Sequence, residues 1–187
     1  MDIERAAIPD VLIVRPKKFG DERGFFSEVF KAAALEPFGV THAWVQDNHS
    51  FSAAPGVVRG LHFQVGKYAQ AKLIRVTRGA LLDVAVDIRK GSPTYGQHVA
   101  VELSADNWTQ LFIPIGFAHG FATLTPNTEA LYKVTSYWSQ PNEGGVLWND
   151  PDLGIAWPIK QSEATINARD ASWPRLKDFD SPFTYLG

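Results

Sequence analysis

QAKLIRVT (70–77) and ALLDVAVDI (80–88) decide the fold class, because apolar residues recur at every second position along both stretches. This period of two is typical of a β-strand whose successive side chains point to opposite faces. In the first stretch Lys72 shares a face with Ile74 and Val76. The two stretches therefore predict neighbouring strands, one of which carries a cation on an otherwise apolar face.

Single polar residues on apolar faces recur elsewhere in the chain. Asp83 shares a face with Leu81 and Ala85, and Tyr132 lies on an apolar face of EALYKVTSYW (129–138). One interpretation is a solvated outer face that carries stray apolar groups. The other is a barrel whose interior is a ligand cavity. The alternation alone leaves both interpretations open.

Further short runs of β-type residues lie on both sides of these stretches, separated by Gly, Pro, Asn and Asp. They are VLIV (11–14), FFSEVF (25–30), AWVQDNHSF (43–51), VVRGLHFQ (57–64), QHVAVEL (97–103), TQLFIP (109–114), HGFATL (119–124) and EALYKVTSYW (129–138). Strands at this spacing predict an all-β sandwich or barrel. Helical signal is limited to short segments near 31–37 and 163–170.

The composition predicts one domain, residues 1–187, in the cytoplasm. The length suits a single core, and the formal net charge of −2 comes without a run of Lys or Arg, so no nucleic-acid partner is expected. There is no cysteine, which excludes disulfides and thiolate chemistry. We find no signal peptide, and no apolar run approaches the roughly 18 residues of a membrane span.

One motif indicates the kind of barrel. PIGFAHG (114–120) fits the P-x-G-x-x-H motif of cupin barrels, and GLHFQ (60–64) occupies the place of the other cupin motif, which supplies metal ligands. Here Gln64 replaces a His, and only His62 and His119 remain of the four expected ligands. A metal site is hard to assemble from two ligands. The sequence therefore predicts a cupin-like jelly-roll β-barrel with no metal, in which chemistry depends on acid and base groups.

Three side chains are candidates for that chemistry. A His has a pKa of about 6.5, so His62 can act as a base near neutral pH, although a lone His in a strand is more often structural. Lys72 could stabilise an oxyanion or lie on the surface. Tyr132 could donate a proton, and Trp138 on the same face could stack on a flat ring, or both could be core aromatics. No G-x-G-x-x-G signature for a dinucleotide is present, and we expect no cofactor.

Other polar groups could bind a ligand. In QDNHS (46–50), Gln46 and Asn48 would offer amide groups to a sugar or a base, unless the segment is a turn. Arg23 and Arg59 could hold a diphosphate, since guanidinium groups bind phosphate oxygens in pairs, or they could form surface ion pairs.

These segments together resemble the dTDP-4-dehydrorhamnose 3,5-epimerase family. The matching stretches cover nearly the whole chain in the family's order, which makes the resemblance specific. They are DERGFFSEVF (21–30), QDNHSFS (46–52), VVRGLHFQ (57–64), residues 69–107, QLFIPIGFAHGF (110–121), EALYKVTSYW (129–138), WNDPDLGIAWP (148–158) and ARDASWP (168–174).

The resemblance implies a role for each matching residue. His62 would be the base, Asp170 the carboxylate that orients it with Asp83 nearby, Lys72 the group that faces the enolate oxygen, and Tyr132 the proton donor. Trp138 would stack on the thymine. The remaining substrate-binding positions implied are Arg23, Glu28, Gln46, Asp47, Asn48, Arg59, His119, Glu143 and Arg169.

The implied activity is cofactor-free epimerisation of C3, C5 or both in dTDP-4-keto-6-deoxy-D-glucose, within deoxysugar synthesis such as that of dTDP-L-rhamnose. A homodimer is also implied, in which an N-terminal strand crosses to the partner, so that Arg23 or Phe25 would serve the partner's site. Departures from the family at GKYAQ (66–70), Trp138 and Arg169 leave the sugar product open. The alternatives are a mono-epimerase, a 3,4-ketoisomerase, a metal-dependent oxygenase and a non-catalytic carbohydrate-binding jelly roll.

Overall fold

The computed structural model describes all residues, 1–187, and the predicted all-β class is confirmed. Its strands are β1 (Asp2–Arg5), β2 (Leu12–Arg15), β3 (Lys18–Asp21), β4 (Gly24–Ser27), β5 (Gln46–Ser52), β6 (Val58–Gln64), β7 (Lys72–Arg78), β8 (Ala80–Asp87), β9 (His98–Ser104), β10 (Gln110–Ile113), β11 (Phe117–Thr123), β12 (Thr128–Val134) and β13 (Glu143–Gly145). The helices are α1 (Ala32–Leu35) and the 3-10 turns η1 (Glu36–Phe38), η2 (Gly66–Tyr68), η3 (Gln140–Asn142), η4 (Pro151–Leu153), η5 (Gln161–Glu163), η6 (Asp170–Ser172) and η7 (Leu176–Asp178). None of these helices has the length and hydropathy needed to cross a membrane.

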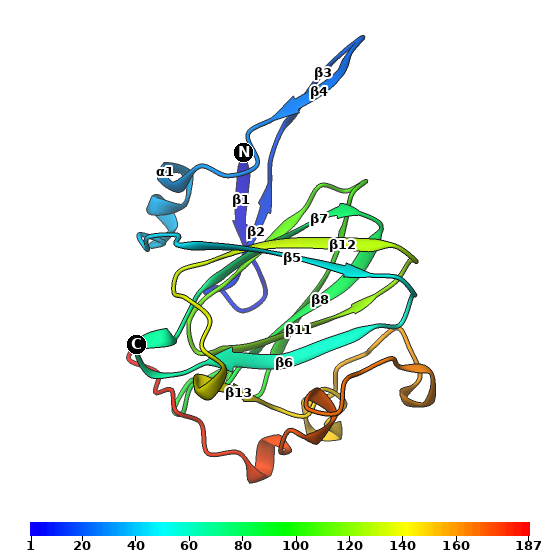
Figure 1. The fold of residues 1–187 in the computed structure, drawn as a ribbon. Helices are drawn as coiled ribbons and strands as arrows, with labels where there is room; N and C mark the ends of the chain where they lie inside the picture. Colours follow the sequence, from blue (N-terminus) through cyan, green and yellow to red (C-terminus); the bar gives the residue numbers. More distant parts are fainter.

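Two antiparallel sheets face each other and form the jelly-roll barrel (Figure 1). The first sheet has the strand order β1-β2-β10-β7-β12-β5, and the second has the order β13-β6-β11-β8-β9. The first sheet therefore ends at β5 and the second at β13. These two ends lie on the same side of the barrel in Figure 1, which is where the cavity described below is found.

The space between the sheets holds an apolar core cluster that includes Ile74 and Val76 of β7 and Leu81 of β8. Because side chains alternate along a strand, Lys72 and Asp83 share the inward face with these residues. Lys72 is 9% exposed and Asp83 is fully buried. The barrel-interior interpretation is therefore confirmed for these strands, and the interpretation as a solvated outer face is wrong.

The hairpin of β3 and β4 pairs with no other strand and projects away from the barrel (Figure 1). It exposes Phe19, Phe25 and Phe26, each by more than half. Its base contacts the barrel, where Lys18 Nζ lies 4.1 Å from the centroid of the Trp108 ring. Because β4 ends at Ser27, the strand predicted over 25–30 is confirmed only in its first residues. A two-stranded hairpin with an apolar surface is marginal alone in water, so this surface is typical of an interface.

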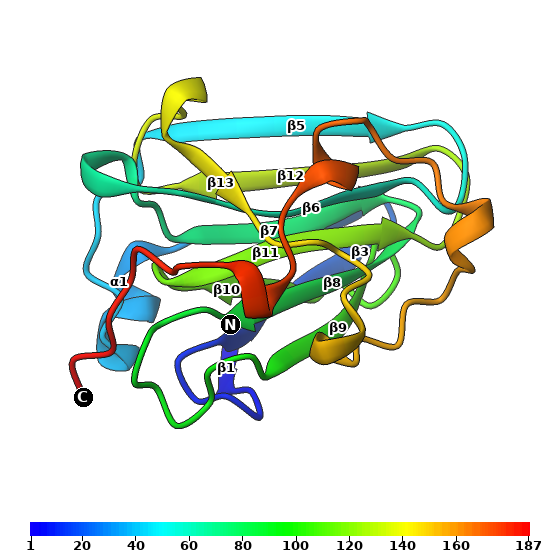
Figure 2. The ribbon, with the colours of Figure 1, turned by 90° about the horizontal axis from the view of Figure 1, so that it is seen from below.

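The segment after β13, residues 146–187, crosses the outer face of the second sheet, and we call it the C-terminal strap (Figure 2). Strap residues such as Trp148 and Leu153 pack against Val84 and Val86 of β8 in a second apolar cluster. A bridge between Val57 and Thr165 pins the strap to the start of β6. The prediction of a helix near 163–170 is wrong, since only the 3-10 turns η5 and η6 form at its ends. The backbone there is held by packing and a bridge to the second sheet instead of helical hydrogen bonds.

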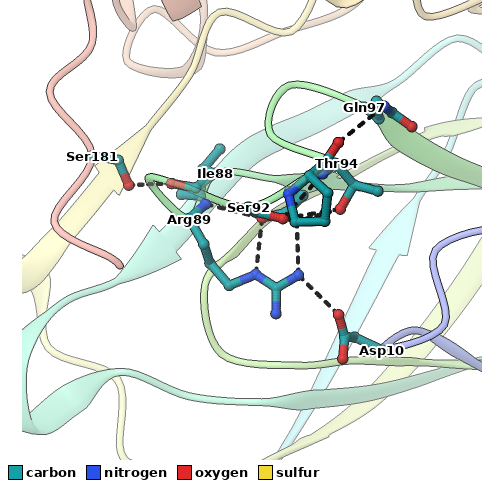
Figure 3. A network of polar contacts seen from close by, with 9 residues as sticks. Asp10, Ile88, Arg89, Ser92, Thr94, Gln97 and Ser181 are labelled. Carbon is teal, nitrogen blue, oxygen red and sulfur yellow. Dashed lines mark hydrogen bonds and ion pairs between the residues drawn. The ribbon is translucent and has the colours of Figure 1, made fainter. Parts of the chain in front are cut away.

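A buried ionic network fastens the N-terminal loop to the end of β8, where the hydroxyl of Ser181 in the strap also donates to the Ile88 carbonyl (Figure 3). Asp87 is fully buried and accepts hydrogen bonds from Arg89, Ser92 and Thr94. Burial would raise the pKa of Asp87, but these hydrogen bonds hold it below its usual value. Arg89 also donates to Asp10 at 2.9 Å. None of these residues lines the cavity, so we assign the network a structural role.

Candidate active site

A cavity of about 330 Å³ opens between the two sheets, on the side of β5 and β13. It brings together residues from β5, β6, β7, β11, β12, β13 and the strap. The predicted site residues that line it are Gln46, Asn48, Arg59, His62, Lys72, His119, Tyr132, Trp138, Glu143, Arg169 and Asp170. The imidazole, ammonium and phenol predicted to carry the chemistry therefore face one compartment.

His62 projects from β6 and pairs with Asp170 of the strap, with Nε2 and Oδ2 3.2 Å apart. Asp170 is 1% exposed. Burial would raise the pKa of this carboxyl, but hydrogen bonds from His62 and from the Gly60 N–H, together with the charge of Arg169, lower it to about 2. An ionised carboxylate only accepts hydrogen bonds, so Nε2 of His62 carries the proton. The Nδ1 lone pair is then the basic position of the ring.

Lys72 begins β7 inside the barrel, and no protein group accepts a hydrogen bond from its ammonium. Burial lowers the pKa of Lys72 to about 8, while the negative charges of Asp83 and Glu143 oppose that shift. Near neutral pH the side chain remains a cation with unpaired N–H groups. Such a group can stabilise negative charge on an oxygen that enters the cavity.

Tyr132 lies on the inward face of β12, in the same sheet as Lys72 and in the sheet opposite His62. Burial raises the pKa of its phenol, the charge of Arg59 partly opposes the shift, and Glu143 adds to it. The phenol therefore keeps its proton near neutral pH and can donate it. His62 on the second sheet and Tyr132 on the first sheet thus present a base and an acid from two sides of one cavity.

A second His–carboxylate pair lies deeper in the barrel. His119 of β11 is directly opposite His62 in the strand register, and its Nε2 lies 2.7 Å from Oδ1 of Asp83. Burial lowers the pKa of His119, although Asp83 opposes that shift. Asp83 thus orients His119, whereas Asp170 alone contacts His62. No group of three His, Cys, Asp or Glu side chains in the structure is arranged to hold a metal ion.

The mouth of the cavity carries amide and indole groups in a connected arrangement. Gln46 donates to Asn48 at 2.8 Å and accepts from the backbone N–H of Trp138 at 3.2 Å. Trp138 is 53% exposed at the mouth, so its indole is accessible to a ligand. Arg59 donates to the Phe51 carbonyl, and its buried Nε has no partner. These groups can bind a planar base and a phosphate group.

On the other side of the mouth, Glu143 forms an ion pair with Arg169. Arg169 also donates through Nε to Asp170 at 3.2 Å. This chain of charges connects the rim to the His62 pair, so a ligand that contacts Arg169 also lies close to the base.

Four predicted site residues do not line this cavity. Asp83 is buried behind it, where it pairs with His119, and the other three lie on the surface. Arg23 is at the tip of the projecting hairpin, paired with Asp21, and Glu28 follows the hairpin on the surface. Asp47 points to the outer face of β5, where it accepts from Lys133 at 2.9 Å. Within one protomer these side chains do not join the others.

The structure adds cavity residues that the sequence did not single out as site residues, among them Ser50, Gln64, Gln70 and Asn167. The Ser50 hydroxyl is buried and has no partner in the chain. Alternation along β5 could have identified it, because Ser50 shares a face with Asn48. No comparable periodicity exists in the strap that carries Asn167.

Comparison with known proteins gives a consistent result. The family described as dTDP-4-dehydrorhamnose 3,5-epimerase matches residues 5–178. An enzyme of that name from Salmonella typhimurium is 54% identical over 177 residues, which are 94% of this chain and 96% of the relative. A Legionella pneumophila dTDP-6-deoxy-D-glucose-3,5-epimerase, solved with dTDP-4-keto-L-rhamnose, has a TM-score of 0.94 and 42% identity, over 100% of this chain and 99% of the other. A 3'-monoepimerase from Streptomyces bikiniensis, solved with dTDP-quinovose, has a TM-score of 0.85 and 33% identity, over 93% and 87%.

Proposed function

Since this chain belongs to the dTDP-4-dehydrorhamnose 3,5-epimerase family, we propose that it takes dTDP-4-keto-6-deoxy-D-glucose and inverts C3 and C5, on the two sides of the C4 ketone. The product would serve deoxysugar synthesis, such as that of dTDP-L-rhamnose. One observation carries the proposal: a His–Asp base and a protonated phenol face each other across a cavity that also holds an unpaired ammonium.

The first chemical step is removal of a proton from the carbon next to the ketone. Nδ1 of His62 takes that proton, and Asp170 stabilises the imidazolium that forms. The electron pair left on carbon spreads onto the C4 oxygen as an enolate. Lys72 stabilises that oxyanion, since its N–H groups have no protein partner. No electron leaves the sugar, so the step needs no oxidant.

The second step returns a proton to the opposite face of the same carbon. One group cannot serve both faces unless the sugar turns over, so a second group is required. Tyr132 reaches the cavity from the other sheet and keeps its proton, because burial raises the pKa of its phenol. The imidazole and the phenol thus divide removal and delivery of the proton between the two faces.

The rim would hold the nucleotide. Trp138 exposes its indole for stacking on the thymine, and Gln46 and Asn48 supply amide groups beside it. The guanidinium group of Arg59, which lines the cavity, suits a diphosphate oxygen. His119, with its Nε2 bonded to Asp83, can accept through Nδ1 from a sugar hydroxyl.

We further propose that residues 1–187 form one domain that works as a cytoplasmic homodimer, with the hairpin of β3 and β4 inserted into the partner. The exposed phenyl rings of the hairpin support this arrangement. It would bring Arg23 and Glu28 to a second copy's cavity, where Arg23 would add to the phosphate-binding groups and the Glu28 carboxylate would accept a hydrogen bond from the substrate.

Product analysis tests the proposed reaction. The purified protein incubated with dTDP-4-keto-6-deoxy-D-glucose in D2O is expected to yield a product inverted at C3 and C5 with deuterium at both carbons by NMR. Deuterium and inversion at a single carbon would indicate a mono-epimerase. An unchanged substrate without deuterium would overturn the proposal.

The pKa of Lys72 predicts an alkaline limit. Its ammonium is present below its pKa of about 8 and is lost as the pH rises through that value. We expect kcat/KM to fall above about pH 8, because this parameter reports the groups of the free enzyme. In Lys72→Arg the guanidinium stays charged, so the limit should move to higher pH. Lys133→Arg, on the outer face of β12, should leave it in place. An unmoved limit in Lys72→Arg would contradict the assignment.

A further inference from the structure

The carboxylate of the catalytic pair is not carried by the barrel. Asp170 lies in η6, a single 3-10 turn of the strap, 108 positions after His62. A turn this short has little rigidity of its own. The 3.2 Å contact between the two residues is also near the outer limit of a hydrogen bond, so a small displacement of the turn would break it.

Asn167 holds this turn. Its side-chain Oδ1 accepts the backbone N–H of Asp170 at 2.7 Å, and its backbone carbonyl accepts the N–H of Ala171 at 3.1 Å. An Asn that accepts from the N–H three residues later is the usual cap of a helical turn. The bond ends on the residue that bears the carboxylate, so it fixes the position of that backbone directly. Asn167 also lines the cavity.

The strap is anchored on both sides of this cap. Before it, the Thr165 carbonyl accepts the N–H of Val58 at 2.9 Å. After it, the Trp173 indole covers Gly145, where an added Cβ would lie 2.4 Å from the ring. Gly145 is directly opposite His62 in the pairing of β13 with β6. Residues 165 and 173 are therefore fixed to the strands around His62, and Asn167 fixes the backbone between these two points.

We propose that Asn167 is a positioning residue that keeps Asp170 in contact with His62, and that without its side-chain oxygen the base is poorly oriented. This proposal rests on the proposed function for its kinetic readout. The expected effect is on kcat and not on binding, because the nucleotide groups at the rim do not depend on this bond.

The test uses two variants of Asn167. Asn167→Ala is expected to lower kcat roughly 10-fold to 100-fold, the cost of a slightly misplaced catalytic group, with KM and dTDP binding within about twofold of wild type. Asn167→Ser restores a capping oxygen and is expected to recover kcat to within about threefold. Circular dichroism and thermal melts establish that both variants fold.

Ser172→Ala is the matched control. Ser172 lies in the same turn and its hydroxyl donates to the Arg169 carbonyl at 2.8 Å, but it forms no hydrogen bond with Asp170. A general loosening of the turn would affect both positions. An equal loss of kcat in Ser172→Ala, a full kcat in Asn167→Ala, or no recovery in Asn167→Ser would each overturn the proposal.

A measurement that needs no catalytic turnover tests the role of Asn167 independently of the proposed reaction. The ring ¹⁵N shifts of His62 are expected to report a proton on Nε2 in the wild type and a mixture of the two neutral tautomers in Asn167→Ala. If the wild type fails to epimerise the sugar, the proposed function fails, and these shifts still decide the role of Asn167. An unchanged tautomer in Asn167→Ala would count against it.

Discussion

Replacing His62 by Asn is expected to abolish deuterium incorporation at C3 and C5, with a loss of roughly 10²–10⁴-fold, the usual contribution of a positioned base. Asn keeps a polar side chain of similar reach, but its amide cannot take a proton from carbon. Trp138, Gln46 and Arg59 remain in place at the rim, so the nucleotide should still bind. The measurement is solvent exchange by NMR, with dTDP binding followed by calorimetry.

His49→Asn is the matched control for this change. His49 lies on the same sheet as Tyr132, but its ring is exposed on the outer face of β5, near Glu129. Exchange in this variant should equal that of the wild type. Full exchange at either carbon in His62→Asn would reject His62 as the base for that carbon.

Replacing Tyr132 by Phe is expected to slow inversion by roughly 10²-fold or more, since delivery of the proton to the second face depends on the phenol. Exchange should be affected less, because deprotonation by His62 and return of deuterium to the same face do not need the phenol. The ring of Phe fills the same space. The ratio of exchange to inversion, followed in one NMR time course, is therefore the informative quantity.

Tyr95→Phe removes a hydroxyl outside the cavity and should change neither rate. If Tyr132→Phe slows exchange and inversion equally, the phenol acts in the first step or in binding, and its role as proton donor is wrong. If neither rate changes, another group delivers the proton.

The barrel and its inward-facing groups could be predicted from local pattern. Period-two alternation placed Lys72 and Tyr132 on faces shared with apolar residues, and the structure buries both faces between the sheets. Alternation alone could not decide whether such a face surrounds a cavity or meets water. That distinction depends on which strands face each other, which is a long-range property.

The strap could not be predicted in the same way. Asp170 reaches His62 from a segment without periodicity, and only the family resemblance indicated its role. The cap was not predicted; its one signal in the sequence is that Asn167 precedes Asp170 by the three residues that a capping bond requires. The strand β3 was missed because KFGD has a single apolar residue, Phe19, and is exposed on both faces.

One difference between the predicted site and the structure concerns the residues of the hairpin. Arg23 and Glu28 match substrate-binding positions, yet the fold of one chain carries them away from the cavity. A sequence pattern assigns residues to a site without indicating whether the site belongs to the same chain or to a second copy. Residues on an element that pairs with nothing in its own chain are where this ambiguity arises.

The separation of His62 from Asp170 by 108 positions has a consequence for translation. The ribosome releases the strands that bear the imidazole, ammonium and phenol well before the strap that bears the carboxylate, and folding during synthesis begins from the N-terminal side. A nascent chain can therefore assemble most of the barrel while its base still lacks a carboxylate. If His62 and Asp170 act as proposed, we expect catalytic competence to be among the last properties that the growing polypeptide acquires.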